Sequence, residues 1–104
     1  MKILCVIDSL GSGGAQRQLV EIAKGISEKG HDVQVLIYHN IMFHKPILDK
    51  TDVKVILIEE TNSLKRIFKM RKFIQAANPD LIISFLQTPN LISILSSFPF
   101  KIFP

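Results

Sequence analysis

Cysteine is nearly missing from this 104-residue chain, and tryptophan is missing altogether. A single thiol cannot close an internal disulfide or supply the several thiolates of a structural zinc site. That thiol, Cys5, lies inside an apolar run, where a free cysteine is usually buried and inert. Glycine and proline occur only five times each, which argues against long linkers and disordered tails. Residues 1–104 are therefore expected to form one globular domain.

The sequence also lacks a stretch typical of a secretory signal or a membrane span. The run after Lys2 stops at Asp8 after five apolar residues, short of the roughly 7 to 15 that a signal peptide needs. Residues 81–98 carry serine, glutamine, threonine and asparagine among their apolar side chains, which makes the centre too polar for a spanning helix. We expect a cytoplasmic protein.

Acidic residues are few, and basic ones are concentrated in one stretch. The formal net charge is +4 with a pI near 9.4. The ordinary interpretation of the basic stretch is the solvated face of an amphipathic helix. The alternative is peripheral contact with an anionic membrane at the inner face of the plasma membrane, to which each basic residue can contribute roughly 1 kcal/mol. No nucleic-acid-binding module is recognisable, so no nucleic acid is expected as a partner. The basic residues of this stretch are Lys65, Arg66, Lys69, Arg71 and Lys72.

What the chain does contain is a regular alternation of short apolar runs and helical patterns. Continuous apolar runs of strand length suit strands that are buried on both faces. Strands that alternate with helices imply a parallel sheet with right-handed crossovers. Strands are expected at residues 2–7, 32–38, 53–59, 80–85 and 100–103, and helices at 15–28, 64–78 and 90–97, with a short one opening at Pro46.

The two long helices each show an apolar face and recognisable ends. In the first, the apolar positions recur at i, i+3, i+4 and i+7, and Gly30 is expected at its C-terminus. In the second, Ser63 is expected as the N-cap, and Asn78 ends the helix because Pro79 follows it. The apolar face of the second helix is expected to contain Leu64, Ile67, Phe68, Ile74 and Ala77.

These elements predict an α/β fold, a Rossmann-like three-layer sandwich with a parallel sheet of about five strands in the order 3-2-1-4-5. In such sheets ligands bind beyond the C-terminal ends of the strands, where the strand order reverses. That position lies between strands 1 and 4. It is expected to bring residues 8–16 and 86–90 around one crevice.

The turn GSGG at residues 11–14 leads from the first strand into the first helix. The start of a helix offers unpaired N–H groups and the positive end of its dipole, and glycines let a phosphate reach them. The alternative is a tight turn with no ligand. A dinucleotide site is disfavoured, because Gln16 occupies the third glycine position and no acid follows the second strand. The Walker A pattern G-x-x-x-x-G-K-[ST] is lacking as well.

The motifs GGAQR at residues 13–17 and GHDV at residues 30–33 resemble the opening of the group 1 glycosyltransferases, family 4, of the GT-B fold. NPDLIISFLQTPNLISIL, which starts at residue 78, is similar to that family's fourth strand and following loop. The resemblance covers nearly the whole chain. It implies the acceptor-side N-terminal domain of an enzyme that transfers a hexosyl group, with retention, from a nucleotide diphosphate sugar to a glycan or lipid-linked acceptor. It implies no cofactor besides this donor substrate.

In that family the glycine turn reaches the donor diphosphate across a cleft between two Rossmann-like domains. By position this role falls on Gly13 and Gly14, and Gln16 either assists at the helix start or acts only as a cap. Four residues on the acceptor side could bind sugar hydroxyls or serve only in turns and caps. They are Asp8, Gln87, Thr88 and Asn90.

No catalytic base can be nominated from the sequence. Many family members have a histidine after the fourth strand, and this chain has none there. His39 and His44 follow the second strand on the ligand side and could touch an acceptor, although a plain loop role is the simpler interpretation. His31 lies at the opposite end of that strand. The three histidines have no spacing typical of a metal site, so no metal is expected.

The family's second domain, with its E-x7-E signature, has no counterpart here. Glu59 and Glu60 are adjacent, and no glutamate lies eight residues from either. We therefore expect a truncated gene product, an excised piece or one half of a split enzyme, inactive alone and completed by a second chain with the donor domain. The rival hypothesis is a non-catalytic Rossmann-like binding module that pairs with another chain through an exposed fifth strand. A receiver-like signalling domain is disfavoured, because it needs an acidic pair after the first strand and an aspartate after the third.

Overall fold

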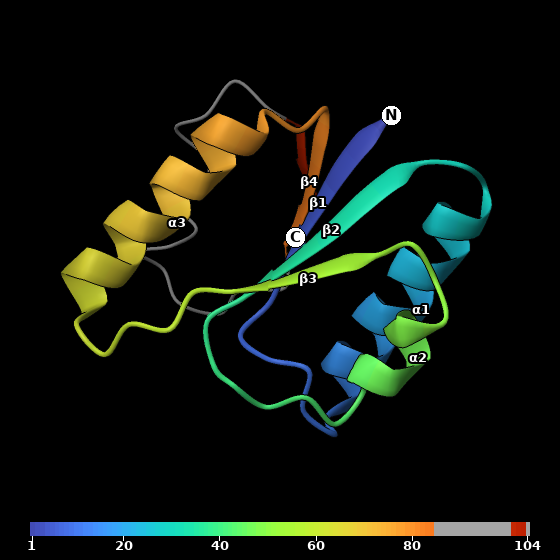
Figure 1. Ribbon diagram of the computed structural model, residues 1–104, viewed down its shortest axis with the longest axis horizontal. Helices are drawn as coiled ribbons and strands as arrows, with labels where there is room; N and C mark the ends of the chain where they lie inside the picture. The colour runs from blue at the N-terminus through green and yellow to red at the C-terminus, as the bar shows by residue number, and fades with distance from the viewer. Residues whose placement is uncertain (85–100, 104) are drawn as a thin grey trace.

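The computed structural model describes residues 1–84 and 101–103, and Figure 1 shows how its strands and helices follow one another. In chain order the elements are β1 (Lys2–Val6), α1 (Gly14–Glu28), β2 (Asp32–Ile37), α2 (Lys45–Asp49), β3 (Lys54–Leu57), α3 (Ser63–Ala77), β4 (Leu81–Ser84) and β5 (Lys101–Phe103). The predicted alternation of strands and helices is confirmed, although β3 is shorter than predicted. The helix predicted at residues 90–97 lies outside the described residues.

The strands form one parallel sheet in the predicted order, β3-β2-β1-β4-β5. β1 is the central strand, since Cys5 is paired with Val35 of β2 on one side and with Ile83 of β4 on the other. The strand order reverses there, because β2 and β3 lie on one side of β1 and β4 and β5 on the other. The C-terminal ends of β1 and β4 therefore mark the place where Rossmann-like sheets bind ligands.

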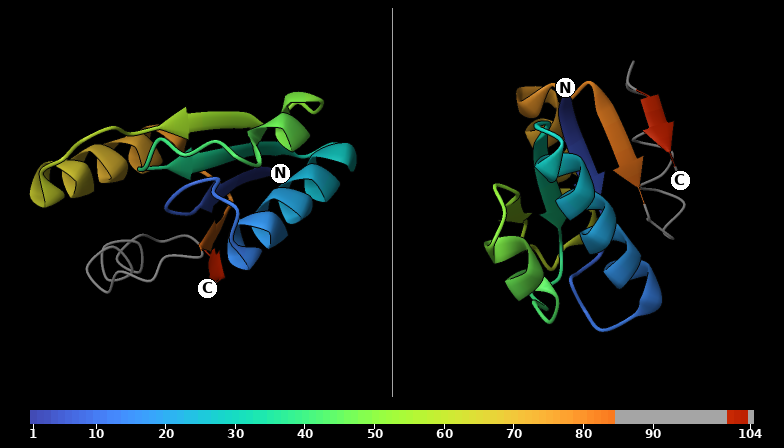
Figure 2. Two further views of the ribbon diagram at one scale, coloured as in Figure 1. Left: turned by 90° about the horizontal axis from the view of Figure 1, so that it is seen from below. Right: turned by 90° about the vertical axis from the view of Figure 1, so that its right-hand side faces the viewer.

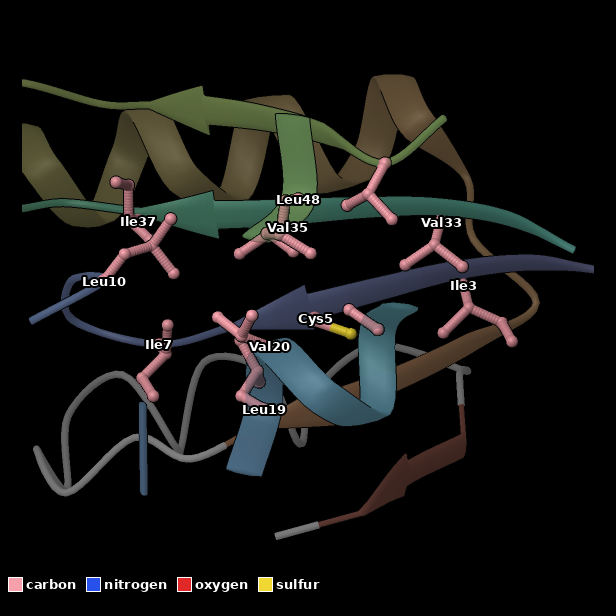
Figure 3. Packing of buried hydrophobic residues seen from close by; sticks show 12 residues of the cluster. Ile3, Cys5, Ile7, Leu10, Leu19, Val20, Val33, Val35, Ile37 and Leu48 are labelled. Atoms are coloured by element: carbon pink, nitrogen blue, oxygen red, sulfur yellow. The ribbon is translucent and has the colours of Figure 1, made fainter. Parts of the chain in front are cut away.

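Helices cover both faces of the sheet, which confirms the predicted three layers. α1 and α2 pack on one face and α3 on the other (Figures 1 and 2). The side chains of β1 alternate between two cores. Ile3, Cys5 and Ile7 enter the core under α1 and α2 (Figure 3), whereas Leu4 and Val6 enter the core under α3. A strand that is buried on both faces has an unbroken apolar sequence, which explains the run KILCVI.

The thiol of Cys5 lies at the centre of this arrangement and has no exposed surface. Burial raises its pKa to about 12, because a thiolate is disfavoured away from water. The prediction of a buried, inert cysteine is confirmed.

α1 begins at Gly14, with Gly13 as its N-cap, and ends at Glu28. Gly30 follows in the left-handed region with φ of 91°, and its N–H donates to the carbonyl of Ser27 at 3.0 Å. Glycine adopts such a φ without a Cβ clash. The C-cap itself is Lys29, so Gly30, which was expected as the C-cap, is the next residue and ends the helix from there.

The N-cap of α3 is Asn62, so the prediction of Ser63 is wrong. Asn62 Oδ1 accepts hydrogen bonds from the N–H groups of Leu64 at 3.0 Å and Lys65 at 3.1 Å. The amide side chain thereby caps the helix one residue earlier, and Ser63 becomes its first residue. Asn78 ends α3 as predicted, with φ of 47° ahead of the proline.

The buried face of α3 also differs from the predicted one. Met70 and Ile74 are buried against the sheet with Ile67 packed beside them, whereas Leu64 and Phe68 are 67% and 68% exposed. At about 100° per residue, positions 67, 70 and 74 form one stripe that excludes 64 and 68. Apolar residues lie around much of this helix, so the sequence alone does not determine which side of the helix faces the sheet. Packing against β1, β2 and β4 selects the stripe that includes Met70.

Candidate functional site

The loops that follow β1 and β2 are held together at the C-terminal edge of the sheet. The N–H of Leu10 donates to the carbonyl of Ile41, and the N–H of His44 donates to the carbonyl of Leu10, both at 2.9 Å. Nearer the strands, the N–H of His39 donates to the carbonyl of Asp8 at 2.8 Å. These backbone hydrogen bonds fix one loop against the other. The glycine turn is therefore attached to a rigid edge of the sheet.

The turn at Gly13 and Gly14 leaves the start of α1 open. Gly13 is the N-cap, and within residues 1–84 and 101–103 no side chain caps the N–H groups of the first helical turn. A Cβ added to Gly14 would meet no described atom within 4 Å, and the first turn of α1 contains no acidic residue. The N–H groups and the helix dipole therefore face an open approach that suits an anion.

Gln16 folds back over this turn toward Asp8. Its Nε2 donates to Asp8 Oδ1 at 3.1 Å, and the backbone N–H of Ser9 donates to the same oxygen at 2.8 Å. A Cβ on Gly13 would collide with Gln16 Oε1, so a glycine at position 13 makes room for the folded amide. These contacts tie the end of β1 to the first turn of α1.

The structure brings together four of the seven predicted binding residues, namely Asp8, Gly13, Gly14 and Gln16. The other three, Gln87, Thr88 and Asn90, lie outside the described residues. They follow β4 in the sequence, and β4 is paired with β1 up to Ser84 and Val6. The binding role of all seven residues stays a prediction.

Sequence reasoning missed an apolar rim beside the glycine turn. Ile41 and Phe43 are 53% and 67% exposed on the loop between β2 and α2, and Ile41 Cγ2 would be 3.6 Å from a Cβ on Gly11. His44 is buried beside Phe43, with the ring centroids 4.9 Å apart and the rings edge-on. Among the described residues, His44 Nε2 has no hydrogen-bond partner. The signal that could have revealed this rim was the run of three apolar residues, 41–43, inside a polar loop.

Among the described residues, the turn and the end of β1 present backbone N–H groups, the Asp8 carboxylate, the Gln16 amide and the Ser9 hydroxyl, and His39 and His44 lie on the neighbouring loop. Within residues 1–84 and 101–103, no cluster of three His, Cys, Asp or Glu side chains could hold a metal ion. In the same ranges no helix combines the length and the apolarity needed to cross a membrane. The chain is therefore a Rossmann-like domain. The N-terminus of α1 lies at the C-terminal ends of the strands, where such sheets bind ligands.

Comparison of the sequence with known proteins identifies the class. No protein-family model matches the chain. It is similar to the GalNAc-alpha-(1->4)-GalNAc-alpha-(1->3)-diNAcBac-PP-undecaprenol alpha-1,4-N-acetyl-D-galactosaminyltransferase of Campylobacter jejuni, with 32% identity over 112 residues. The match covers 97% of this chain but 30% of that enzyme, so the chain spans less than a third of the curated relative. The predicted resemblance to glycosyltransferases is confirmed over 97% of this chain.

Two crystal structures share the fold. Anabaena HepE, in complex with UDP and glucose, superposes with a TM-score of 0.63 at 24% identity, over 92% of this chain and 26% of that one. Glycinamide ribonucleotide transformylase 1 from Symbiobacterium toebii superposes with a TM-score of 0.66 at 19% identity, over 98% of this chain and 50% of that one. At these identities the likeness shows a common Rossmann-like fold, which supports many unrelated reactions.

Proposed function

We propose that the chain is the acceptor-side half of a GT-B glycosyltransferase. It would contribute to the transfer of a hexosyl group from a nucleotide diphosphate sugar to a glycan or lipid-linked acceptor. The observation that carries this proposal is the GGAQR turn, which opens the start of α1 at the C-terminal edge of the sheet. The Campylobacter relative supports it, because its name describes a sugar transferase with an undecaprenol-linked substrate.

The donor diphosphate is the group that the glycine turn would contact. Transfer breaks the bond between the sugar and the diphosphate, and the diphosphate leaves as an anion. The N–H groups at Gly13 and Gly14 and the positive end of α1 would stabilise this charge as it develops, and contacts that strengthen in the transition state raise the rate. Gln16, held by Asp8, would keep the turn in the open form.

The acceptor would lie beside β1 and the segment that follows β4. The Asp8 carboxylate can accept a hydrogen bond from a sugar hydroxyl, and Gln87, Thr88 and Asn90 carry the side-chain types that orient hydroxyl groups. No side chain is assigned as the base. The roles proposed for this chain are therefore binding and orientation.

A second chain or segment would have to supply the donor-binding half, because no E-x7-E signature occurs in the 104 residues. The chain alone is therefore expected to show no sugar transfer when a nucleotide diphosphate sugar and a lipid-linked acceptor are supplied together. Clear transfer by the chain without a partner would contradict this division of roles.

Titration with UDP tests whether the glycine turn binds the donor diphosphate or binds no ligand. In NMR spectra of the chain, the amide resonances of Gly13 and Gly14 should shift with added UDP, and that of Gly25 should not. Gly14→Ala should weaken the response several-fold, because its Cβ would enter the open approach to the helix start. The same change should preserve or raise stability, since alanine is the better helix former.

Gly25→Ala is the matched control for this titration. Gly25 lies in the same helix, and a Cβ there would also meet no atom of the described residues within 4 Å. The substitution should stabilise the chain by roughly 0.5–1 kcal/mol and leave the UDP response unchanged. If both variants respond to UDP as the parent chain does, the turn does not face the diphosphate.

The second candidate function is a non-catalytic binding module. It is favoured by β5, a three-residue strand that stands at one end of the strand order next to β4. Strands at such a position can accept a further strand from another chain. Light scattering over a range of concentrations should then show self-association or a stable complex. A monomer at high concentration would count against this function.

We propose a cytoplasmic location with peripheral contact at the inner face of the plasma membrane. The net charge of +4 and the undecaprenol-linked substrate in the name of the relative support it. Attraction to an anionic leaflet is screened by salt. Fractionation of cells should therefore release the chain from membranes at high salt. Retention in the membrane pellet after a salt wash would contradict a peripheral location.

A further inference from the structure

The apolar rim beside the glycine turn takes no part in the core. Ile41 and Phe43 are 53% and 67% exposed, whereas Met42 between them packs against the core under α1 and α2, and His44 is buried. Side chains therefore point alternately outward and inward along residues 41–44. The inward pair fixes the loop, so the exposure of the outward pair is built into the fold.

The rim is held against the glycine turn by main-chain and side-chain contacts. Backbone hydrogen bonds join Leu10 to Ile41 and to His44, each at 2.9 Å. Ile41 Cγ2 would lie 3.6 Å from a Cβ on Gly11. The rings of Phe43 and the buried His44 meet at 86°, with their centroids 4.9 Å apart. A side chain that is already ordered loses little conformational entropy when it binds a ligand.

Groups that can bind hydroxyls lie next to the rim. His39 and Asn40 precede the rim in the loop, and both are exposed. The N–H of His39 donates to the carbonyl of Asp8 at 2.8 Å, which keeps this stretch beside the end of β1. Gln16 donates to Asp8 Oδ1, so the Oδ2 atom can accept a further hydrogen bond. In Figures 1 and 2 the loops after β1 and β2 leave the sheet at the same end.

An exposed aromatic face beside such groups suits a sugar ring. The face of an aromatic ring carries partial negative charge and attracts polarised C–H groups. In a galactose-configured pyranose three neighbouring C–H groups lie on one face, because the 4-hydroxyl is axial, whereas a glucose-configured ring divides them between its two faces. The hydroxyls at the edge of the ring remain free to hydrogen-bond with carboxylates, amides and imidazoles.

We propose that the apolar rim binds a galactose-configured sugar, with the apolar face of the pyranose stacked on the Phe43 ring. Ile41 would cover the edge of the sugar nearest the glycine turn. Asp8, His39 and Asn40 would hydrogen-bond to its hydroxyls. Phe43 would thereby select the configuration of the 4-hydroxyl. That this sugar belongs to the acceptor rests on the proposed function.

Two other occupants fit the rim less well. A stable protein interface buries about 800 Å² on each partner, whereas the rim offers two side chains. An anionic bilayer attracts surfaces with basic residues, but the ammonium group nearest in sequence, that of Lys45, is paired with Asp49 Oδ1 at 2.7 Å. Anionic headgroups would also repel the Asp8 carboxylate. A neutral sugar meets neither obstacle.

A tryptophan reporter tests the stacking directly, because the chain has no tryptophan of its own. In Phe43→Trp, methyl β-D-galactopyranoside at millimolar concentrations should change the tryptophan emission, and methyl β-D-glucopyranoside should change it less. Phe68→Trp is the matched control, since Phe68 is 68% exposed on α3, and its emission should not respond. An unchanged emission at position 43, or equal changes at both positions, would overturn the proposal.

NMR titrations of the full chain with the same two glycosides measure the selectivity. Phe43→Leu keeps an apolar side chain but removes the aromatic face, so it should weaken galactoside binding roughly two- to tenfold. The ratio of galactoside to glucoside affinity should fall toward one in Phe43→Leu and keep the parent value in Phe43→Tyr. Phe68→Leu is the control and should bind as the parent chain does. Circular dichroism verifies that each variant is folded. If Phe43→Leu retained the parent ratio, the proposal would be overturned.

Glycoside binding is measured without UDP, so this proposal and the proposed function can fail separately. Galactoside binding that depends on Phe43, without a UDP response at Gly13 and Gly14, would uphold the sugar site and remove the transferase proposal. A UDP response without galactoside binding would overturn the sugar site alone. If vesicles of phosphatidylglycerol shift the emission of Phe43→Trp and the galactoside does not, the rim contacts lipid and the proposal is overturned.

Discussion

At the scale of single residues, Gly13 and Gln16 work as a pair. The backbone of Gly13 has φ of −66°, which any residue can adopt. The glycine leaves space that the end of the flexible Gln16 side chain occupies while its amide hydrogen-bonds to Asp8, and a Cβ at position 13 would displace that amide. Gly30 is the opposite case, since its φ of 91° lies in the region that favours glycine.

A double-mutant cycle tests this pairing. Gly13→Ala should destabilise the chain by about 1 kcal/mol, because the displaced Gln16 loses its hydrogen bond to Asp8 and alanine is a poorer N-cap than glycine. In a Gln16→Ala background the same change should cost less, because only the difference between alanine and glycine as N-cap remains. Urea unfolding measures both values. Equal costs in the two backgrounds would show that the two residues are not coupled.

At the scale of an element, α3 shows where the cap of a helix can be misassigned. Asn62 and Ser63 are both good N-cap residues by type, and the sequence alone does not distinguish them. The structure selects Asn62, whose Oδ1 reaches two N–H groups of the first turn. Asn62 N–H in turn donates to Glu60 Oε1 at 3.2 Å, which helps to place it.

Alanine substitutions at these two neighbours give a clear contrast. Asn62→Ala should destabilise the chain by roughly 0.5–2 kcal/mol, since two N–H groups lose their acceptor. Ser63→Ala should change stability by less than about 0.5 kcal/mol, because the cap remains in place. Thermal and urea unfolding of both variants check this. If Ser63→Ala lowered stability more than Asn62→Ala did, Ser63 would be the N-cap, as the sequence predicts.

The elements themselves could largely be predicted from local patterns. The run KILCVI indicates a strand buried on both faces, and the glycine at position 30 marks the end of α1. The face of α1 follows in part from one apolar stripe, in which Leu19 and Ala23 are buried. Ile22, which the same spacing predicts on this face, is 40% exposed, and Val20 is buried instead. α3 has apolar residues at too many positions for one stripe, so Leu64 and Phe68 were placed in the core by sequence and in solvent by the fold.

At the scale of the whole molecule, burial of Cys5 makes the free energy of unfolding depend on pH in the alkaline range. The folded chain raises the pKa of this thiol from 9.0 to about 12. Above pH 9 the unfolded chain releases a proton that the folded chain retains, so the free energy of unfolding falls as pH rises from about 9 toward 12. Below this window the thiol is neutral in both states and contributes no pH dependence.

We therefore compare the parent chain with Cys5→Ala across this range of pH. The free energy of unfolding should fall more steeply for the parent chain, by up to about 1.4 kcal/mol for each pH unit. The variant will be less stable at every pH because it leaves a cavity, so the test is the slope and not the absolute value. Parallel slopes from urea unfolding would contradict the raised pKa.

The candidate site was predictable only in its location. Chain order and the glycine turn placed Asp8, Gly13 and Gly14 at the edge where the strand order reverses. The link from Gln16 to Asp8 could not be foreseen, and the exposed side chains of Ile41 and Phe43 were signalled only by an apolar run inside a polar loop. They depend on how two loops distant in sequence are joined by hydrogen bonds between Leu10 and the loop after β2.

The sequence by itself determined the strands and helices of the described residues, their order in the sheet and the likeness to glycosyltransferases. These follow from the spacing of apolar residues, from helix-ending glycine and asparagine, and from short motifs, all of which act over a few neighbouring residues. The tertiary structure decided which side of α3 faces the sheet, which residue caps it and how Gln16 folds onto the glycine turn. These choices depend on contacts between distant segments, where burial of Met70 and Ile74 leaves Phe68 in solvent.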